Sequence, residues 1–291
     1  MTNCISAFIG IPEEVQTWFE KLGDFSSGSI NWASAFGSFY DQMITKGGYK
    51  TALQGLLTTI EIAVLGLIIG LILGTVIALV KVMPKYNPIV KILSVVCDIY
   101  VGFFRGTPMV VQLLLGYFVV LPMLKIPSVG MTVAVMTLGP DLGIIIFFLL
   151  SMIKIPVNAV MVAIAIFGLN SGAYVSEIMR AGIQSVDPGQ LEAGRAVGLP
   201  YRVAMMKIVV PQTIKNILPT LGNEFIVLIK ETSIVSFIAV VDLTKAFKAI
   251  GDATYEYIIP YVMLALVYLV IVIIITVLIK LMERRLKRNE R

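Results

Sequence analysis

The sequence predicts an all-α protein that crosses a membrane several times, and three observations carry this prediction. Of the 291 residues, 58% are hydrophobic and only 14% are charged, and the mean hydropathy of +0.92 lies outside the usual range of soluble domains. Long apolar runs recur along the chain, and several approach the roughly 20 residues that a hydrocarbon core requires. The basic residues flank these runs, as they do in polytopic membrane proteins.

Composition excludes several function classes. Histidine is absent, which removes HExxH zinc sites, Ser-His-Asp triads and Cys-His dyads. Cys4 and Cys97 are too few and too far apart for a disulfide framework. Because the basic residues behind the net charge of +5 flank apolar runs, they indicate orientation rather than nucleic-acid binding. We expect no catalytic residue, no metal and no cofactor in this chain.

Residues 1–49 lack the basic start and compact apolar centre of a cleavable signal. They carry five acidic residues against two lysines. We interpret them as an extracytoplasmic leader, with an amphipathic helix around Pro12–Leu22.

The first predicted span, Leu53–Val80, carries small residues at strict four-residue spacing: Gly66, Gly70, Gly74 and Ala78. This spacing places them along one helix face, where a second helix can approach closely. Close packing without a direct transport role is the favoured interpretation of this stripe.

A short basic turn follows this span, with Lys81, Lys85 and Lys91, and the positive-inside rule places it in the cytoplasm. The N-terminus is therefore predicted outside. The next apolar run, Ile89–Leu121, is too long for one straight span. Arg105-Gly106-Thr107-Pro108 interrupts it, because proline removes a backbone hydrogen bond and disfavours helix at the preceding residue. We expect a kinked or broken helix that returns to the outside.

The other end of the chain sets the direction of the remaining spans. Lys280–Arg291 holds six basic and two acidic residues, so the tail, residues 286–291, is predicted in the cytoplasm and Tyr257–Ile279 runs inward to it. Working backwards gives an outer loop at Asp242–Glu256, an outward span at Thr213–Val240, a cytoplasmic loop at Arg180–Gln212 and an inward span at Val157–Met179. Residues 122–156 must then start and end outside. A re-entrant hairpin and two short spans both satisfy this, and we favour the re-entrant or surface-packed form.

The cytoplasmic loop has an internal order of its own. Asp187-Pro188 is typical of a helix start, and a short helix is predicted over Gln190–Val197. Gly198 offers a left-handed end, and a second helix is predicted from Tyr201 to Val210, before Pro211. A helix of about two turns is unstable alone, so it must pack on something. The residues leave internal packing and docking to a partner equally open.

Glu192-Ala193-Gly194, then Gly198, then nine residues and Ile208-Val209-Val210-Pro211 resemble the EAA loop of ATP-binding cassette (ABC) importer permeases. Gly194 replaces the second alanine of that pattern, and Val210 replaces its leucine. The resemblance implies a coupling helix that docks in a groove of a separate ATPase subunit. The implied coupling residues are Glu192, Ala193, Gly194, Gly198, Leu199 and Pro211.

Further stretches narrow the family. YVGFFRGTPMVVQ at Tyr100–Gln112, Gly172–Ile178 with Arg180, and GNEFIVLIKETS at Gly222–Ser233 resemble signatures of polar amino-acid importer permeases. The resemblance covers residues 50–285 and implies the five-span core of an ABC type I importer permease. Against that core, residues 122–156 form an apolar insertion.

Polar groups inside spans are costly and are therefore functional candidates. An amino acid offers an ammonium and a carboxylate, and the spans supply both charge signs and hydroxyl groups for a translocation path. Ion pairing that holds the bundle together is the alternative for each residue. The candidates are Asn170, Ser171, Glu177, Asn223, Glu224, Lys230, Glu231, Thr232 and Ser233. For Arg105, a structural role at the break is favoured.

The resemblance implies a multi-pass subunit of the cytoplasmic membrane that transports a polar amino acid. The sequence has no GxxxxGK[ST] phosphate loop, so ATP and Mg²⁺ are expected in a partner ATPase dimer. The other expected partners are a second permease copy or a paralogue, an extracytoplasmic amino-acid-binding protein and membrane lipid. The alternatives are an ion-coupled secondary transporter and, third, a membrane-embedded enzyme.

Overall fold

A computed structural model describes residues 32–83, 86–123 and 158–288. Within these ranges every regular element is helical and no strand occurs, which confirms the all-α prediction. The predicted helix at Pro12–Leu22, most of the leader, Lys85, the apolar insertion from residue 124 onward and the last three residues of the tail lie outside the described residues.

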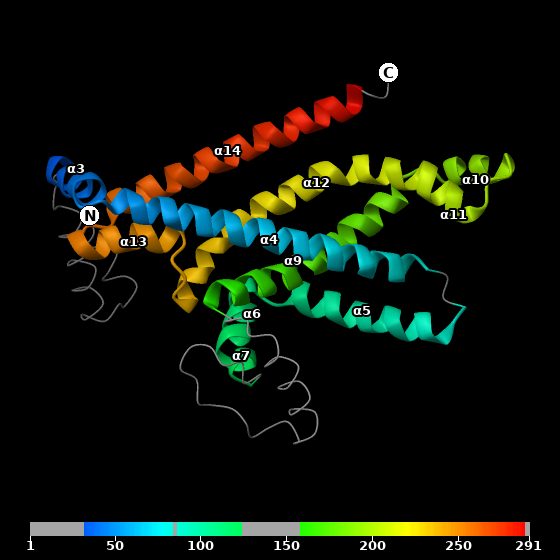
Figure 1. Cartoon of the computed structure of the whole chain (residues 1–291), viewed down its shortest axis with the longest axis horizontal. Helices are drawn as coiled ribbons and strands as arrows, with labels where there is room; N and C mark the ends of the chain where they lie inside the picture. The colour runs from blue at the N-terminus through cyan, green and yellow to red at the C-terminus, as the bar shows by residue number, and fades with distance from the viewer. Residues whose placement is uncertain (1–31, 84–85, 124–157, 289–291) are drawn as a thin grey trace, which may run out of the picture.

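Long helices run along the length of the molecule (Figure 1). They are α4 (Gly48–Val82), α5 (Pro88–Gly106), α9 (Ala159–Gln184), α12 (Val210–Glu231) and α14 (Ile258–Arg288). Three are long and apolar enough to cross a membrane: α4, α9 and the Ile258–Arg285 part of α14. The helix α5 and the segment Met109–Met123 that follows it are together also long and apolar enough to cross a membrane, although the chain bends sharply between them. The prediction of a polytopic membrane protein is thus confirmed, while α12, which carries Lys215, Glu224, Lys230 and Glu231, is not among these candidates.

The helices α4 and α9 pack along much of their lengths, and the small-residue stripe lies in their contact. A Cβ added at Gly66, Gly70 or Gly74 would meet Phe167, Ser171 or Val175, respectively, at 2.7–3.0 Å from the Cβ of each. Both residue numbers rise together along this contact, so the two helices run parallel, as their predicted directions require. The stripe therefore acts as predicted, as a surface for close helix packing.

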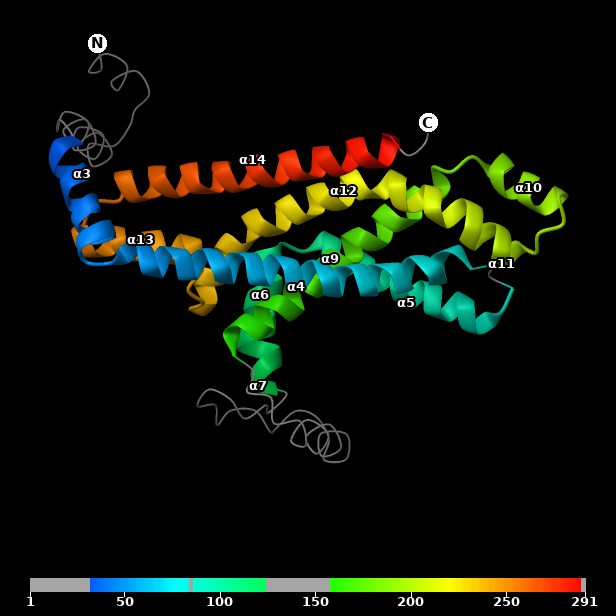
Figure 2. The ribbon, with the colours of Figure 1, turned by 45° about the horizontal axis from the view of Figure 1, so that its top comes forward.

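The predicted break after Arg105 is present. The helix α5 ends at Gly106, and α6 (Met109–Leu115) leaves it at 108°. A wide helical turn, η2 (Gly116–Val120), and the single turn α7 (Leu121–Met123) continue α6. Figure 2 shows these helices projecting from the side of the bundle.

At one end of the bundle the chain differs from its prediction in two places. The helix α12 ends at Glu231, and the 3₁₀ helix η4 (Thr232–Ile238) closes at Ala239 with a left-handed φ of 64°, so Thr213–Val240 is not one straight span. The predicted outer loop Asp242–Glu256 contains a helix, α13 (Leu243–Thr254). Its start is fixed by Asp242, whose carboxylate accepts hydrogen bonds from the backbone N–H groups of Thr244 and Lys245.

Two short elements precede α4 at this same end. They are the helix α3 (Trp32–Tyr40) and the wide helical turn η1 (Asp41–Thr45). In Figure 2, α3 stands across the ends of the long helices, where it contacts α13 and α14. Part of the predicted leader is therefore helical and packed on the bundle.

At the other end lie α10 (Pro188–Ala196), α11 (Tyr201–Ala204) and the wide turn η3 (Met205–Val209). The prediction that a second loop helix stops before Pro211 is wrong, because η3 leads directly into α12. Pro211 stands in the first turn of α12, where a helix has no use for the missing N–H.

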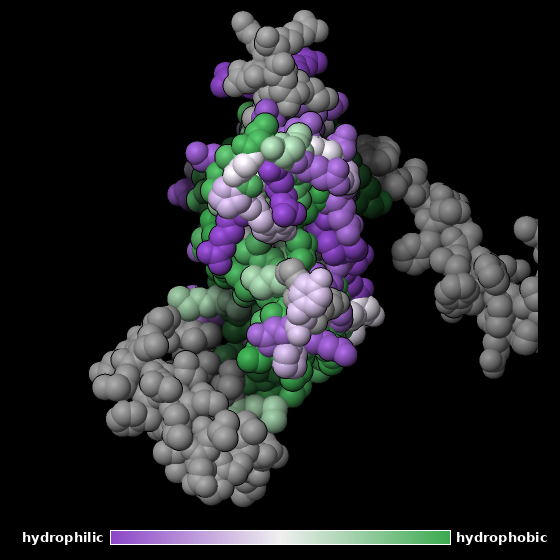
Figure 3. Space-filling view, turned by 90° about the vertical axis from the view of Figure 1, so that its right-hand side faces the viewer, coloured by the Kyte–Doolittle hydropathy of each residue, from purple (hydrophilic) through white to green (hydrophobic). Residues whose placement is uncertain are grey.

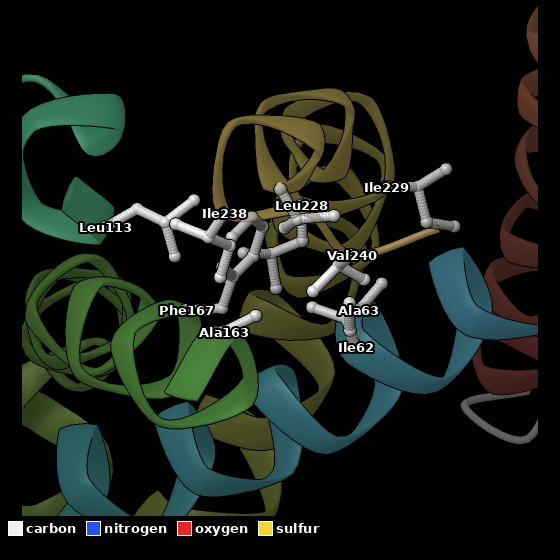
Figure 4. Packing of buried hydrophobic residues seen from close by; sticks show 10 residues of the cluster. Ile62, Ala63, Leu113, Ala163, Phe167, Leu228, Ile229, Ile238 and Val240 are labelled. Atoms are coloured by element: carbon white, nitrogen blue, oxygen red, sulfur yellow. The ribbon is translucent and has the colours of Figure 1, made fainter. Parts of the chain in front are cut away.

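The central core joins residues of α4, α6, α9, α12 and η4, and Figure 4 shows how they pack. Phe167 of α9, Leu113 of α6 and Ile62 of α4 are fully buried there. The other members come from α4, α9, α12 and η4, with Val240 just after η4. They are Ala63, Ala163, Leu228, Ile229, Val235, Ile238 and Val240. Burial of these side chains holds α6 against the bundle despite the sharp bend before it.

Candidate functional site: the helical loop and the polar groups of the bundle

The helix α10 begins and ends as its sequence predicts. The Asp187 carboxylate accepts a hydrogen bond of 2.8 Å from the Gly189 N–H. At the other end, the Gly198 N–H bonds to the Arg195 carbonyl and the Leu199 N–H bonds to the Gly194 carbonyl. This pair is a Schellman motif, and its C′ residue Gly198 has the predicted left-handed conformation, with φ of 89°.

The inner face of α10 packs closely on the helices that follow it. Gly194 is buried, and a Cβ at this position would lie 2.7 Å from Ile208 Cδ1 and 3.3 Å from Ala204 Cβ. Leu199 folds back over the same glycine. Gly194 thus permits the contact between α10 and the α11–η3 stretch. An alanine at position 194 would displace the flexible end of the Ile208 side chain.

The opposite face of α10 is exposed. Glu192 and Ala193 are exposed on α10, and Val197 and Tyr201 beside it are 79% and 50% exposed. The loop projects beyond the ends of the long helices (Figure 2), and hydrophilic residues gather over this end of the molecule (Figure 3). A short helix that is packed on one side and exposed on the other is suited to insertion into a groove of another subunit.

A cleft of about 370 Å³ opens at the base of this loop, between α9 and α12. The Asn216 amide donates a hydrogen bond of 2.9 Å to Ser185 Oγ. Beside this bond, the Ile217 side chain packs directly against Gly182, where a Cβ would leave no room for it. The lining residues are Glu177, Ile178, Ala181, Gly182, Ser185, Asn216, Ile217 and Thr220. The two helices that carry the loop are therefore held together at its base.

Glu177, predicted as a candidate for the path, takes part in an ion-pair network. Its two carboxylate oxygens lie 2.9 Å from Lys81 Nζ and 2.6 Å from Arg180 Nη2. Lys81 also lies 3.0 Å from Asp98 on α5. The placement of Lys81 in the turn after the span is wrong, because Lys81 lies in the last turn of α4. Its side chain, only 12% exposed, joins α4 to α5 and α9.

Asn170, another candidate, belongs to a buried amide cluster at the break. Its side-chain NH₂ donates to the Phe104 carbonyl and to Gln112 Oε1 at 2.9 Å. The Gln112 NH₂ donates in turn to the carbonyls of Phe104 and Thr107 and to Thr107 Oγ1. These bonds satisfy carbonyl groups that the interrupted helix leaves without N–H partners.

The remaining residues of the break lie around this cluster. The Thr107 hydroxyl donates to the Phe103 carbonyl, and Pro108 supplies the carbonyl that begins the α6 hydrogen bonds. Gly106 is exposed and has open space around it. The Arg105 guanidinium lies 5.4 Å from the Tyr174 ring centroid, a cation–π contact to α9.

The candidates on α12 and η4 differ in exposure. Asn223 and Lys230 are exposed, whereas Glu224, Glu231 and Ser233 are part-buried. Thr232 is fully buried, and its hydroxyl donates to the Ile229 carbonyl. The Glu224 carboxyl group lies near the Ser171 hydroxyl of α9, so α9 and α12 bring these two candidates together.

Sequence reasoning missed three residues of these clusters: Lys81, Asp98 and Gln112. Gln112 carried a usable signal, because an amide inside the apolar run Met109–Leu115 is costly unless it is hydrogen-bonded. Asp98 likewise interrupts the apolar run of α5.

Comparison with known proteins assigns the chain to a family. The model of the binding-protein-dependent transport system inner membrane component matches residues 66–288. The arginine transport system permease protein ArtQ of Bacillus subtilis is 38% identical over 82% of this chain and 93% of its own length. A putative glutamine transport system permease protein GlnP of Rickettsia bellii is 36% identical over 80% of this chain and 92% of its own length.

Solved structures agree with this assignment. The crystal structure of an amino acid ABC transporter with histidines has a chain that is 36% identical, with a TM-score of 0.65 over 84% of this chain and 98% of that one. The inward-facing MetNI methionine ABC transporter, at 14% identity and a TM-score of 0.57, shares the fold. The chain is a membrane-embedded transport permease that belongs to the family of binding-protein-dependent transport system inner membrane components.

Proposed function

We propose that this chain is the transmembrane permease subunit of an ATP-driven importer of a polar amino acid. The relatives with the greatest similarity described above are named as arginine and glutamine permeases, and a structural relative is an amino acid ABC transporter. The observation that carries the proposal is the α10 loop, whose inner face is packed through Gly194 and whose outer face exposes Glu192 and Ala193. Family membership disfavours the ion-coupled secondary transporter, which has no use for such a loop.

In this proposal α10 docks in a groove of an ATPase subunit, and the partner ATPase dimer holds the ATP and Mg²⁺. Glu192 and Ala193 lie on the docking face, while Gly194, Gly198 and Leu199 hold α10 on the helices behind it. Pro211 lies where the helical path from η3 enters α12. Closure of the ATPase dimer moves α10, and the helical path transmits the movement to α12.

The path itself forms between two permease subunits, either two copies of this chain or this chain and a paralogue. Glu224 and Ser171 supply polar groups where α9 faces α12, and Asn223, Lys230, Glu231 and Ser233 supply others along α12 and η4. Asn170, Glu177 and Thr232 have partners within the bundle, so we assign them first to holding the helices in place.

The sidedness follows from the loop. With α10 in the cytoplasm, the C-terminus of α14 also faces the cytoplasm and the N-terminal segment lies outside. The end that carries α3 and α13 then faces the extracytoplasmic amino-acid-binding protein. The exposed apolar residues of α4 and α14 contact membrane lipid, since both helices keep large apolar side chains at the surface.

The proposal is tested by affinity purification of the complex from its native membrane, followed by mass spectrometry and an ATPase assay. Recovery of a nucleotide-binding subunit with vanadate-sensitive ATP hydrolysis is the expected result. Recovery of the chain alone, inactive toward ATP and able to transport amino acids in liposomes, would overturn the proposal.

A further inference from the structure

The segment α3–η1 has two apolar faces with different surroundings. On one face Ala35 is buried, and Phe39 and Met43 pack against a core of Ala52, Leu243, Phe247 and Leu264. On the other face Phe36, Tyr40 and Ile44 are 53%, 63% and 50% exposed. Each set recurs at four-residue spacing, so each follows one side of the helix. Packing within the chain explains only the first set.

The position of α3 indicates what covers the second set. In Figure 2, α3 stands across the bundle at the end where α4 and α14 begin, and it contacts α13 and α14. A helix across the ends of membrane-spanning helices lies along the membrane plane, at the depth of the boundary between headgroups and acyl chains. Tyr40 is of the type that this boundary favours, and phenylalanine such as Phe36 is common on the apolar face of interfacial helices.

Exposed apolar side chains also occur at the start of α4, the next helix along the chain. The next large apolar side chains at the surface after Ile44 are Tyr49, Leu53 and Leu57, which are 47%, 57% and 60% exposed. Between the two groups lies Lys46, whose ammonium is 3.2 Å from the Asp41 carboxylate and remains exposed. Lysine at this depth can place its charge among lipid phosphates while its methylene groups remain in apolar contact.

We propose that α3–η1 is an interfacial membrane anchor whose Phe36, Tyr40 and Ile44 enter the bilayer surface at the end of the bundle opposite α10. The exposed apolar residues at the start of α4 favour lipid over a protein partner, because that part of a membrane-spanning helix is itself covered by lipid. The inference concerns a segment before the family match, which begins at residue 66, and it stands independently of the transported substrate.

The test is spin-label accessibility in the full complex reconstituted into lipid nanodiscs. Single cysteines replace Phe36, Tyr40 and Ile44 one at a time in a Cys4→Ser, Cys97→Ala background. Leu57→Cys gives the lipid reference, and Asp252→Cys on the exposed face of α13 gives the water reference at the same end. Since all three test side chains are exposed, none of the three substitutions removes a core contact, and each is an independent measurement.

The expected result is a ratio of oxygen to nickel-chelate accessibility at positions 36, 40 and 44 that is several-fold above the Asp252→Cys value and approaches the Leu57→Cys value. A ratio equal to that of Asp252→Cys would place the face in water and overturn the proposal. Labels shielded from both reagents would also overturn it, because protein would then cover the face, either residues 1–31 or a second copy of the chain.

Discussion

The Asn170 amide on α9 and the Gln112 side chain on α6 share a hydrogen bond of 2.9 Å beside the break in the chain at Thr107. Both residues are buried, at 5% and 3% exposure. Through the Phe104 and Thr107 carbonyls, they connect the end of α5, the start of α6 and the middle of α9. The bend of 108° is therefore a defined structure with satisfied backbone groups.

Gln112→Leu should lower the free energy of unfolding by about 1–3 kcal/mol, because it removes the acceptor of one Asn170 hydrogen bond and the Gln112 donor to the Thr107 carbonyl. Thermal unfolding of the complex in nanodiscs measures the effect. Gln54→Ala, at an exposed amide on α4, is the matched control and should change little. An unchanged unfolding temperature for Gln112→Leu would contradict the account of the break.

The ion pair between Lys81 and Glu177 should show coupling. Lys81→Met leaves Glu177 less fully paired, and Glu177→Gln does the same to Lys81, so each alone should cost about 1–3 kcal/mol, between the values for exposed and buried pairs. The double variant should recover part of the loss, since neither charge then remains. A double-mutant cycle from thermal unfolding measures this coupling.

The exposed pair Lys248–Asp252 on α13 provides the comparison, with Lys248→Met expected to have little effect. Additive losses for Lys81→Met and Glu177→Gln would show that the two side chains do not stabilise the bundle together.

Gly74→Ala should destabilise the contact of α4 with α9. The added Cβ would lie 2.7 Å from Val175 Cβ and 2.8 Å from the Ser176 backbone nitrogen, and a backbone atom cannot move aside without shifting the helix. Gly102→Ala on α5, where nothing lies within 4 Å, should instead stabilise by up to about 1 kcal/mol through helix propensity. Shifts of opposite sign in the unfolding temperatures of the two variants would confirm that α4 packs on α9 through Gly74. Equal shifts would count against this contact.

Ala239→Gly should stabilise the protein by about 1 kcal/mol, because an L-residue other than glycine is strained at φ of 64°. The exposed side chain contributes little that the substitution would lose. Ala181→Gly, at an exposed position inside α9, should have the opposite sign. The unfolding temperatures of both variants measure these effects. Destabilisation by Ala239→Gly would show that the backbone at Ala239 is not under strain.

Local patterns in the sequence predicted the features that depend on neighbouring residues. Glycine every four residues predicted a close helix contact on α4, without predicting that α9 makes it. Thr107-Pro108 predicted the break and Gly198 the left-handed end of α10, since each depends on backbone conformation or helix periodicity. The continuous helical path from η3 into α12 was missed, because Pro211 predicted the end of a helix. Proline breaks a helix when it lies in the helix interior, but it is tolerated in the first turn, where Pro211 lies.

Long-range features could not be predicted in this way. The pairing of Lys81 with Glu177 joins residues far apart in the sequence, and the positive-inside rule treats every lysine near a span as a loop charge. The helix α13 is short, and its stability depends on Leu243 and Phe247 in a core shared with α4 and α14. Its sequence nevertheless carried a usable signal, because Leu243, Ala246, Phe247 and Ile250 follow the i, i+3, i+4, i+7 spacing of an amphipathic helix.

The most direct test of the coupling account is ATP-dependent amino-acid uptake by proteoliposomes that contain the purified complex, with or without Ala193→Asp in the exposed face of α10. The account predicts that the substitution abolishes both uptake and association with the ATPase subunit, while the permease keeps its helical circular dichroism. Gly102→Ala on α5, where nothing lies within 4 Å of the added Cβ, should retain uptake. Full uptake and normal ATPase association with Ala193→Asp would contradict the central claim that α10 is the site where ATP hydrolysis is coupled to transport.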